Sequence, residues 1–289
     1  VCYLAEVISN TEKNAKQLEQ HFSLKIDQSL REVQFMGDAH NGGKSVCILI
    51  FNTGKLIYKP KSLKLESKFQ ELITYLNKQI PDTPLYEMNI FTNDTHGWCE
   101  FISHERCRTI DEMKRCYIRV GKLLALLHSL NGVDFHYENV IFNGEYPVLI
   151  DLETLLSVPL KDALSNNESA FLKASKLLKN SVFSVGLLPT KMKLSDNNAV
   201  SIGALDDAQM YEVTVPSIVN ANSSKMKINM ETRQIQTGHK DFKEEGKGSL
   251  ELDFITYLKT GFTEVYEWIL KDKIAFLNLV LKLFKDCQV

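Results

Sequence analysis

A predicted β-hairpin near the middle of the chain constrains the fold more than any other stretch. Two apolar runs, residues 140–142 and 147–150, flank the turn dipeptide Asn143-Gly144, an arrangement typical of two antiparallel strands. Because a hairpin brings its two ends side by side, Asn139 and Asp151 are expected to present an amide oxygen and a carboxylate to one point. Hard oxygen ligands of this kind suit Mg²⁺, which also binds phosphate oxygens.

The loop before this hairpin adds Asp134 and His136. Asp134 is placed to orient or deprotonate a hydroxyl group. With Asn139 and Asp151 these residues have the layout of a kinase catalytic loop and its metal-binding aspartate. The order Asp-x-His-x-x-Asn is closer to lipid-kinase-type loops than to the His-Arg-Asp order of protein kinases. The alternative is an ordinary hairpin whose flanking polar residues cap turns.

A second predicted hairpin lies upstream, with strands over residues 45–51 and 55–59, and it ends at Lys59. In kinase-like folds a strand lysine pairs with the nucleotide phosphates, and Lys59 is the candidate for that role. Lys55, beside the turn, and Lys61, just beyond the strand, compete with it. The structural alternative for Lys59 is a solvated lysine on an edge strand.

A glycine-rich stretch, residues 37–43, leads into this hairpin and contains Asp38 and His40. In a loop that faces phosphates, the two side chains could act as an acid and a base. Beside glycines, the same pair is often a turn that hydrogen-bonds its own backbone.

Helices are predicted over residues 66–79 and 110–130, because apolar side chains recur there at helical spacing. The first follows the Lys59 strand as the αC helix does in kinases, so Glu66 or Glu71 could pair with Lys59. The second leads directly into the loop that carries the candidate catalytic residues. An amphipathic helix is also expected at the N-terminus, over residues 4–22.

Strands are predicted over residues 86–91 and 98–102, on either side of a polar turn. The end of the second strand has the position of a kinase hinge. Its residues would offer backbone groups to an adenine ring: Glu100, Phe101 and Ile102.

The chain after residue 154 is expected to be less regular. In order, we expect a helix, a strand, a loop-rich stretch, a polar mobile segment and C-terminal helices, over residues 162–179, 182–188, 194–207, 220–248 and 249–284. Gly261 is expected to divide two of these helices. Basic side chains of the polar segment could hold an acidic peptide or a phosphate, or could simply be solvated: Lys225, Lys227 and Arg233.

Composition narrows the class of protein. The 289 residues carry a net charge of −2 and are 44% hydrophobic, which is typical of a globular protein and argues against a general nucleic-acid binder. No apolar run approaches the ~20 residues that span a membrane, and the N-terminus does not have the pattern of a signal peptide. The six cysteines lack zinc-ligand spacing and are interpreted as reduced thiols in a cytoplasmic protein.

Several motifs together resemble one family. They are Gly37-Asp38-x-His40-x-x-Gly43, Leu56-Ile57-Tyr58-Lys59-Pro60, Trp98-x-Glu100-Phe101-Ile102, Asp134-x-His136-x-x-Asn139 and Tyr146-Pro147-Val148-Leu149-Ile150-Asp151-Leu152-Glu153-Thr154. Weaker matches continue through Gly186-Leu187-Leu188-Pro189, Val215-Pro216 and Gly261-Phe262. From about residue 30 onward, the chain resembles the dehydratase domain of class II lanthipeptide synthetases, the LanM-type enzymes of lantibiotic biosynthesis.

The resemblance implies an α+β fold with a lipid-kinase-like core of two lobes, residues 1–102 and 103–289. It also implies an enzyme that uses ATP and Mg²⁺ to phosphorylate Ser and Thr of a ribosomally made precursor peptide with a leader. Elimination of the phosphate then gives dehydroalanine or dehydrobutyrine.

The resemblance also assigns roles to residues. Lys59 would contact the ATP phosphates, and Asp134, supported by His136, would act on the substrate hydroxyl. Mg²⁺ would be held by oxygen ligands with a supporting carboxylate: Asn139, Asp151 and Glu153. Asp38 and His40 match a family pair that is linked to the cycle of phosphorylation and elimination.

Two parts of the family pattern are not found in this sequence. They are an Arg- and Thr-containing motif associated with elimination and a C-terminal zinc cyclase domain, which would be a partner within the same parent chain. Both ends of the sequence look cut, so we expect a piece that carries the phosphotransfer residues but lacks part of the elimination machinery. Two alternatives stay open: a kinase-like phosphotransferase acting on a small molecule, and a non-catalytic peptide-binding fragment.

Overall fold

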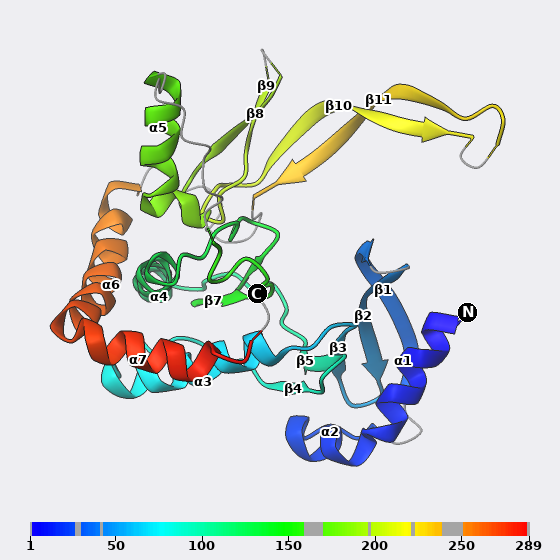
Figure 1. The fold of residues 1–289 in the computed structure, drawn as a ribbon, viewed down its shortest axis with the longest axis horizontal. Coiled ribbons are helices and arrows are strands. Elements are labelled where there is room, and N and C mark those ends of the chain that lie inside the picture. Colours follow the sequence, from blue (N-terminus) through cyan, green and yellow to red (C-terminus); the bar gives the residue numbers. More distant parts are fainter. Residues whose placement is uncertain are drawn as a thin grey trace.

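The protein has the mixed α+β architecture that the sequence predicts (Figure 1). A computed structural model describes residues 2–26, 30–40, 43–158, 170–195, 198–220, 223–238 and 251–287. No helix within those ranges is long and apolar enough to cross a membrane. All six cysteines are free thiols, and four of them are buried.

An antiparallel sheet forms the N-terminal part. Among the described residues it has five strands in the order β1-β2-β3-β5-β4, with bounds Leu30–His40, Lys44–Phe51, Lys55–Lys59, Gly97–Glu100 and Ile90–Thr92. Side chains along β2 alternate between buried and half-buried, as expected for a strand with one face on a core. Helices α1 (Cys2–Lys13) and α2 (Ala15–Phe22) pack on this sheet through a cluster that includes Val7, Leu18, Leu49, Tyr58 and Trp98.

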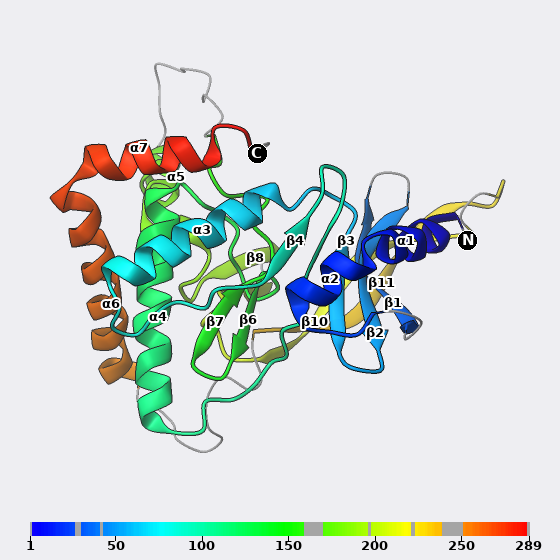
Figure 2. The same cartoon turned by 90° about the horizontal axis from the view of Figure 1, so that it is seen from below.

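A second, larger core surrounds the long helix α4 (Ile110–Ser129). The helix begins at Thr109, whose hydroxyl accepts a hydrogen bond from the Glu112 backbone N–H at 3.1 Å, a standard N-cap. Around α4 lie helices α3, α6 and α7, with bounds Lys64–Gln79, Glu251–Lys271 and Lys273–Phe284. Figure 2 shows α3 crossing α4, and α7 lies beside α3. The predicted helices 66–79 and 110–130 are therefore confirmed.

Helices α4 and α6 touch backbone to backbone through two glycines. A Cβ atom built on Gly121 of α4 would overlap the Leu258 carbonyl, and one built on Gly261 of α6 would overlap the Ile118 carbonyl. The prediction that Gly261 divides two helices is wrong, because Gly261 lies within α6. The break comes at Asp272, whose carboxylate caps α7 by accepting the Ala275 N–H at 2.9 Å.

The middle of the chain differs most from the predicted elements. Residues 182–188 do not form a strand: Val182–Val185 is a 3₁₀ turn, closed by Gly186 at φ +92°. The loop-rich stretch contains a hairpin of β8 (Lys191–Ser195) and β9 (Asn198–Ser201). Much of the polar segment predicted to be mobile is strand β11 (Lys227–Thr237), paired along its length with β10 (Gln209–Val219). Pairing with the preceding strand β10, which the polarity of the segment does not reveal, explains the last difference.

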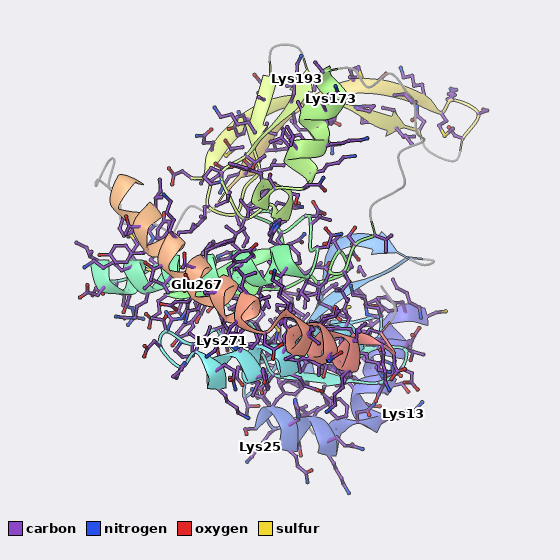
Figure 3. All side chains as sticks on the ribbon, turned by 60° about the vertical axis from the view of Figure 1, so that its left-hand side comes forward. Lys13, Lys25, Lys173, Lys193, Glu267 and Lys271 are labelled. Carbon is purple, nitrogen blue, oxygen red and sulfur yellow. The ribbon has the colours of Figure 1, made fainter. Side chains whose placement is uncertain are left out.

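Smaller differences lie at element boundaries. The predicted strand 86–91 is reduced to β4 (Ile90–Thr92), and the N-terminal helix is interrupted at Asn14. The predicted helix 162–179 is observed as α5 (Ala170–Lys179), and its first part lies outside the described residues, as do residues 239–248 of the polar segment. In Figure 3, Lys173 of α5 and Lys193 of β8 lie together, away from Lys13 and Lys25 at the α1–α2 end.

The close contact of α4 and α6 predicts how one added methyl group at Gly261 changes the stability of the fold. Gly261→Ala should lower the free energy of unfolding by about 2 kcal/mol or more, although alanine is intrinsically the better helix former by about 1 kcal/mol. Chemical denaturation would measure this change. Lys259→Ala, an exposed change on the same helix, should stay within about 0.5 kcal/mol of wild type. Equal stability of both variants would contradict the contact.

Candidate active site

The central hairpin forms as the sequence predicts. Strands β6 (Val140–Asn143) and β7 (Tyr146–Leu149) pair in register, from Val140 opposite Leu149 to Asn143 opposite Tyr146. At the open end, the Ile150 N–H donates to the Asn139 carbonyl oxygen at 3.0 Å. This bond holds Asn139 directly beside the residue that precedes Asp151.

The closed end of the hairpin is anchored to helix α4. Arg119, whose side chain is 3% exposed, approaches Glu145 with Nη1 3.1 Å from Oε2, and Arg115 contacts the same oxygen. The Arg119 guanidinium also lies 4.1 Å from the centre of the Tyr146 ring. Burial raises the pKa of Glu145, but hydrogen bonds from the two arginines outweigh it and leave this pKa below its usual value. The sequence pattern alone does not reveal this anchor, because it joins residues about 30 positions apart.

The loop before the hairpin is fixed by backbone hydrogen bonds. The Phe135 N–H donates to the Val185 carbonyl at 2.8 Å, and the Tyr137 N–H donates to the Ile202 carbonyl at 3.2 Å. The Phe135 ring is fully buried. The 3₁₀ turn and the β8–β9 hairpin therefore help to hold the predicted catalytic loop.

Within this loop, Asp134 and His136 lie together. Asp134 has a left-handed backbone at φ +66°, a conformation that is uncommon for residues other than glycine, that Asp adopts more readily than most, and that clusters at functional sites. The His136 Nδ1 atom accepts the Glu138 N–H at 3.3 Å, which places the proton of a neutral ring on Nε2. This Nε2 atom lies 3.5 Å from Asp134 Oδ1. Asn139 donates its side-chain N–H to the Asp134 carbonyl at 2.8 Å.

Two of the three candidate lysines reach the open end of the hairpin. Lys59, at the end of β3, is 7% exposed, and its Nζ atom donates to the Ile150 carbonyl. Lys61 Nζ lies 3.2 Å from Asp151 Oδ1. Lys55 instead lies over the Phe101 ring, 4.9 Å from its centre.

Lys61 also contacts two further carboxylates, Glu66 of α3 and Glu153, each at 3.6 Å. Glu66 thus pairs with Lys61 rather than with Lys59, and Glu71 pairs with Lys68 at 2.6 Å. The predicted pairing of Glu66 or Glu71 with Lys59 is not observed, because a position on a helix does not fix which of several nearby lysines faces it.

The charges of both lysines act on Asp151. Burial raises the pKa of this carboxyl. The positive charges of Lys59 and Lys61 and a hydrogen bond from the Glu153 N–H have a larger, opposite effect, so the pKa lies below its usual value. The pKa of Lys61 is raised, because the attraction of Asp151 and Glu66 exceeds the opposing effect of burial. Both shifts favour the charged forms of Asp151 and Lys61.

Lys59, Lys61, Asp151 and Glu153 line a cleft of about 240 Å³ between the sheet and the open end of the hairpin. Its lining residues are Lys44, Ser45, Val46, Lys59, Pro60, Lys61, Asp151 and Glu153. Lys44 was not singled out from the sequence, although its position just after the glycine-rich stretch is a usable signal. Its Nζ atom lies 2.7 Å from Glu6 Oε1 of helix α1.

The remaining predicted residues have less informative surroundings. Glu100 accepts the Asn89 N–H at 2.7 Å, and Ile102 packs with Met88, Cys99 and Val148 in a small cluster between sheet and hairpin. Contact of residues 100–102 with adenine stays a prediction. Asp38 and His40 belong to β1 by their backbone, but their side chains lie outside the described part of the structure.

The oxygen donors of the site fit the chemistry of Mg²⁺. In the described ranges, no three His, Cys, Asp or Glu side chains converge as a ready-made metal centre. Mg²⁺ does not need one, since it is commonly held by one or two carboxylates, waters and substrate phosphates. Asp151, Glu153 and the Asn139 amide can supply such ligands, and the carboxylates of Asp151 and Glu153 are already gathered around one cation, Lys61.

Comparison with known proteins places this chain in a family. The family model described as a domain of unknown function, DUF4135, matches residues 1–289. The chain belongs to the DUF4135 family. A related protein is the lacticin 481/lactococcin biosynthesis protein LcnDR2 of Lactococcus lactis subsp. lactis, 28% identical over 291 residues. That match covers 96% of this DUF4135 chain and 31% of the relative.

The name of this relative describes it as a lacticin 481/lactococcin biosynthesis protein. The resemblance to LanM-type lanthipeptide synthetases is thereby confirmed for this DUF4135 chain. Because the chain spans about a third of the relative's length, the reaction of the whole relative is not carried over as a finding.

The anchor between Glu145 and helix α4 predicts how much one substitution in the hairpin destabilises the fold. Glu145→Ala should destabilise the fold by about 3–5 kcal/mol, because it leaves the buried Arg119 charge without its carboxylate. Denaturant unfolding would measure this loss. Glu71→Ala removes the same side chain from an exposed ion pair and should cost less than about 1 kcal/mol. Similar costs for both variants would refute the anchoring role.

The lowered pKa of Glu145 predicts a dependence on pH. An acid with a lowered folded-state pKa stabilises the fold above its unfolded pKa, about 4.3 for glutamate, and loses this contribution as pH falls through the folded value. The difference in unfolding free energy between wild type and Glu145→Gln should be largest at neutral pH and should shrink steadily below about pH 4.3. Denaturation curves collected from pH 7 to pH 3 would test this, and a difference that grows on acidification would contradict it.

Proposed function

We propose that this chain phosphorylates Ser and Thr side chains of a precursor peptide with ATP and Mg²⁺, and that the phosphate is then eliminated. It would serve as the dehydratase part of a LanM-type synthetase built on a lipid-kinase-like core of two lobes. One observation carries the proposal: three lysines and two carboxylates line one cleft at the open end of the hairpin, where Asn139 is hydrogen-bonded to the Asp134 carbonyl.

The charges in the cleft support phosphoryl transfer. Lys59 and Lys61 place ammonium groups where the negative charge of a phosphate chain would need compensation. Asn139, Asp151 and Glu153 are the expected oxygen ligands of Mg²⁺. Bound Mg²⁺ and ATP would supply the phosphoryl group and shield its charge. The contribution of the chain is then mainly positioning.

Asp134 is the proposed acceptor of the substrate hydroxyl proton. Its carboxylate is 60% exposed, so it is accessible to a peptide side chain. His136 faces it at 3.5 Å and would hold its orientation. The link from Asn139 to the Asp134 carbonyl ties the proposed base to a proposed metal ligand. A general base of this kind typically contributes a factor of about 10²–10⁴ to the rate.

The elimination step needs a different set of groups. A base removes the α-proton of the phosphorylated residue, a carbon–carbon double bond forms, and the bond from the β-carbon to the phosphate oxygen breaks. The product is dehydroalanine from Ser or dehydrobutyrine from Thr, and the leaving phosphate takes the electron pair. Lys44, Lys59 and Lys61 offer cations to that phosphate. Asp38 and His40 are carried into this step by the family resemblance alone.

Mass spectrometry of a precursor peptide incubated with the chain, ATP and Mg²⁺ would test the proposal. We expect a phosphoryl mass gain or a loss of water on Ser and Thr. Asp134→Asn and Asp151→Asn should each reduce the rate at least about 100-fold. Asp111→Asn, an exposed change at the start of α4, is the matched control and should leave the rate unchanged.

The other outcomes separate the alternatives. Transfer of phosphate to a small alcohol but not to the peptide would favour a small-molecule phosphotransferase. A folded chain that binds peptide but neither ATP nor metal would indicate a non-catalytic binding protein. Either result would overturn the proposed function.

A further inference from the structure

Lys61 is the meeting point of three separate parts of the fold. It follows β3, and its ammonium group contacts Asp151 and Glu153 after β7 as well as Glu66 on α3, at 3.2, 3.6 and 3.6 Å. No family motif quoted above includes Lys61. A side chain with three acidic partners at the edge of a proposed metal site needs its own explanation.

The carboxylates of this cluster outnumber its ammonium groups. Glu66 has a side chain that is only 8% exposed, and its buried Oε1 atom has no hydrogen-bond partner. The Lys61 charge, 3.6 Å from this oxygen, therefore compensates the Glu66 charge. Asp151 and Glu153 are more exposed, at 33% and 67%, and have access to an incoming ion.

We propose that Lys61 is a displaceable counter-ion of the metal site. Without metal it holds Asp151 and Glu153 together, and a divalent cation displaces it from them. Lys61 then stays with Glu66. This inference rests on the proposed function, because it takes Asp151 and Glu153 as metal ligands.

Repulsion between the incoming cation and the Lys61 ammonium group drives Lys61 away from Asp151 and Glu153. A divalent cation bound to Asp151 Oδ1 would lie within a few ångströms of the Lys61 ammonium group, where two positive charges repel strongly. Lys61 has room to move, since its side chain is 38% exposed. Lys59 does not have that freedom, being 7% exposed and bonded to the Ile150 carbonyl. Lys61 therefore competes with the metal, whereas Lys59 keeps its place.

The first test is metal affinity without nucleotide. Free Mn²⁺ gives an electron paramagnetic resonance signal that is lost on binding, so a titration yields the dissociation constant. We expect Mn²⁺ to bind Lys61→Met about tenfold more tightly than wild type. Lys114→Met removes a lysine charge that is paired with Asp111 at the start of α4 and does not line the cleft, and it should bind Mn²⁺ as wild type does. Lys61→Arg should not bind more tightly.

Two further measurements guard against a misfolded variant. The double variant Lys61→Met/Glu66→Gln also neutralises Glu66, the buried carboxylate that loses its partner when Lys61 is replaced. The gain in Mn²⁺ affinity should persist in this double variant. In wild type, modification of Lys61 by an amine-reactive reagent, followed by peptide mass spectrometry, should become about tenfold faster when Mn²⁺ is added. The rate at Lys44 should not change, and Asp151→Asn should abolish the effect at Lys61.

The outcomes distinguish the two proposals. Mn²⁺ binding that is lost in Asp151→Asn but equal in wild type and Lys61→Met, or increased equally in Lys114→Met, overturns the role of Lys61 and leaves the metal site standing. Lys61 labelling that stays constant on Mn²⁺ binding also overturns it. Absence of any Asp151-dependent Mn²⁺ binding, even with ATP present, overturns the proposed function and this inference together.

Discussion

The β6–β7 hairpin, fixed at both ends, is the constraint on which the rest of the site depends. At the turn, Glu145 receives the guanidinium groups of Arg115 and Arg119 from helix α4. At the open end, Lys59 reaches across from β3 to the Ile150 carbonyl. A hairpin alone is only marginally stable in water, so these ties hold Asn139 and Asp151 in place. They also connect the larger helical core to the N-terminal sheet.

The packing behind the hairpin serves the same purpose. Helix α4 lies directly against α6, because Gly121 and Gly261 remove the side chains that would separate the two backbones. The 3₁₀ turn that ends at Gly186 accepts a hydrogen bond from Phe135. Asp134 thus keeps an uncommon backbone conformation because its neighbours on both sides are fixed. Strain at one residue is tolerated when the surrounding contacts outweigh it.

Membership of the DUF4135 family and the match to a lacticin 481/lactococcin biosynthesis protein agree with the function proposed for the cleft. They support the proposed role in lanthipeptide synthesis, and the cleft suggests how that role could be performed. Within this site, Lys61 joins three carboxylates that would otherwise repel one another. Such a cluster is well suited to exchanging one cation for another, since Asp151 and Glu153 are already brought together.

The sequence by itself determined the local features of this protein. Apolar spacing predicted α3 and α4, and the Asn143-Gly144 turn predicted the central hairpin, because these signals act between near neighbours. Tertiary structure decided the rest. Neither the pairing of Glu66 with Lys61, nor the anchoring of Glu145, nor the burial of Gly261 inside α6 is encoded in any short stretch. Each joins side chains or backbones distant in sequence, and packing alone decides which of several chemically equal partners meet.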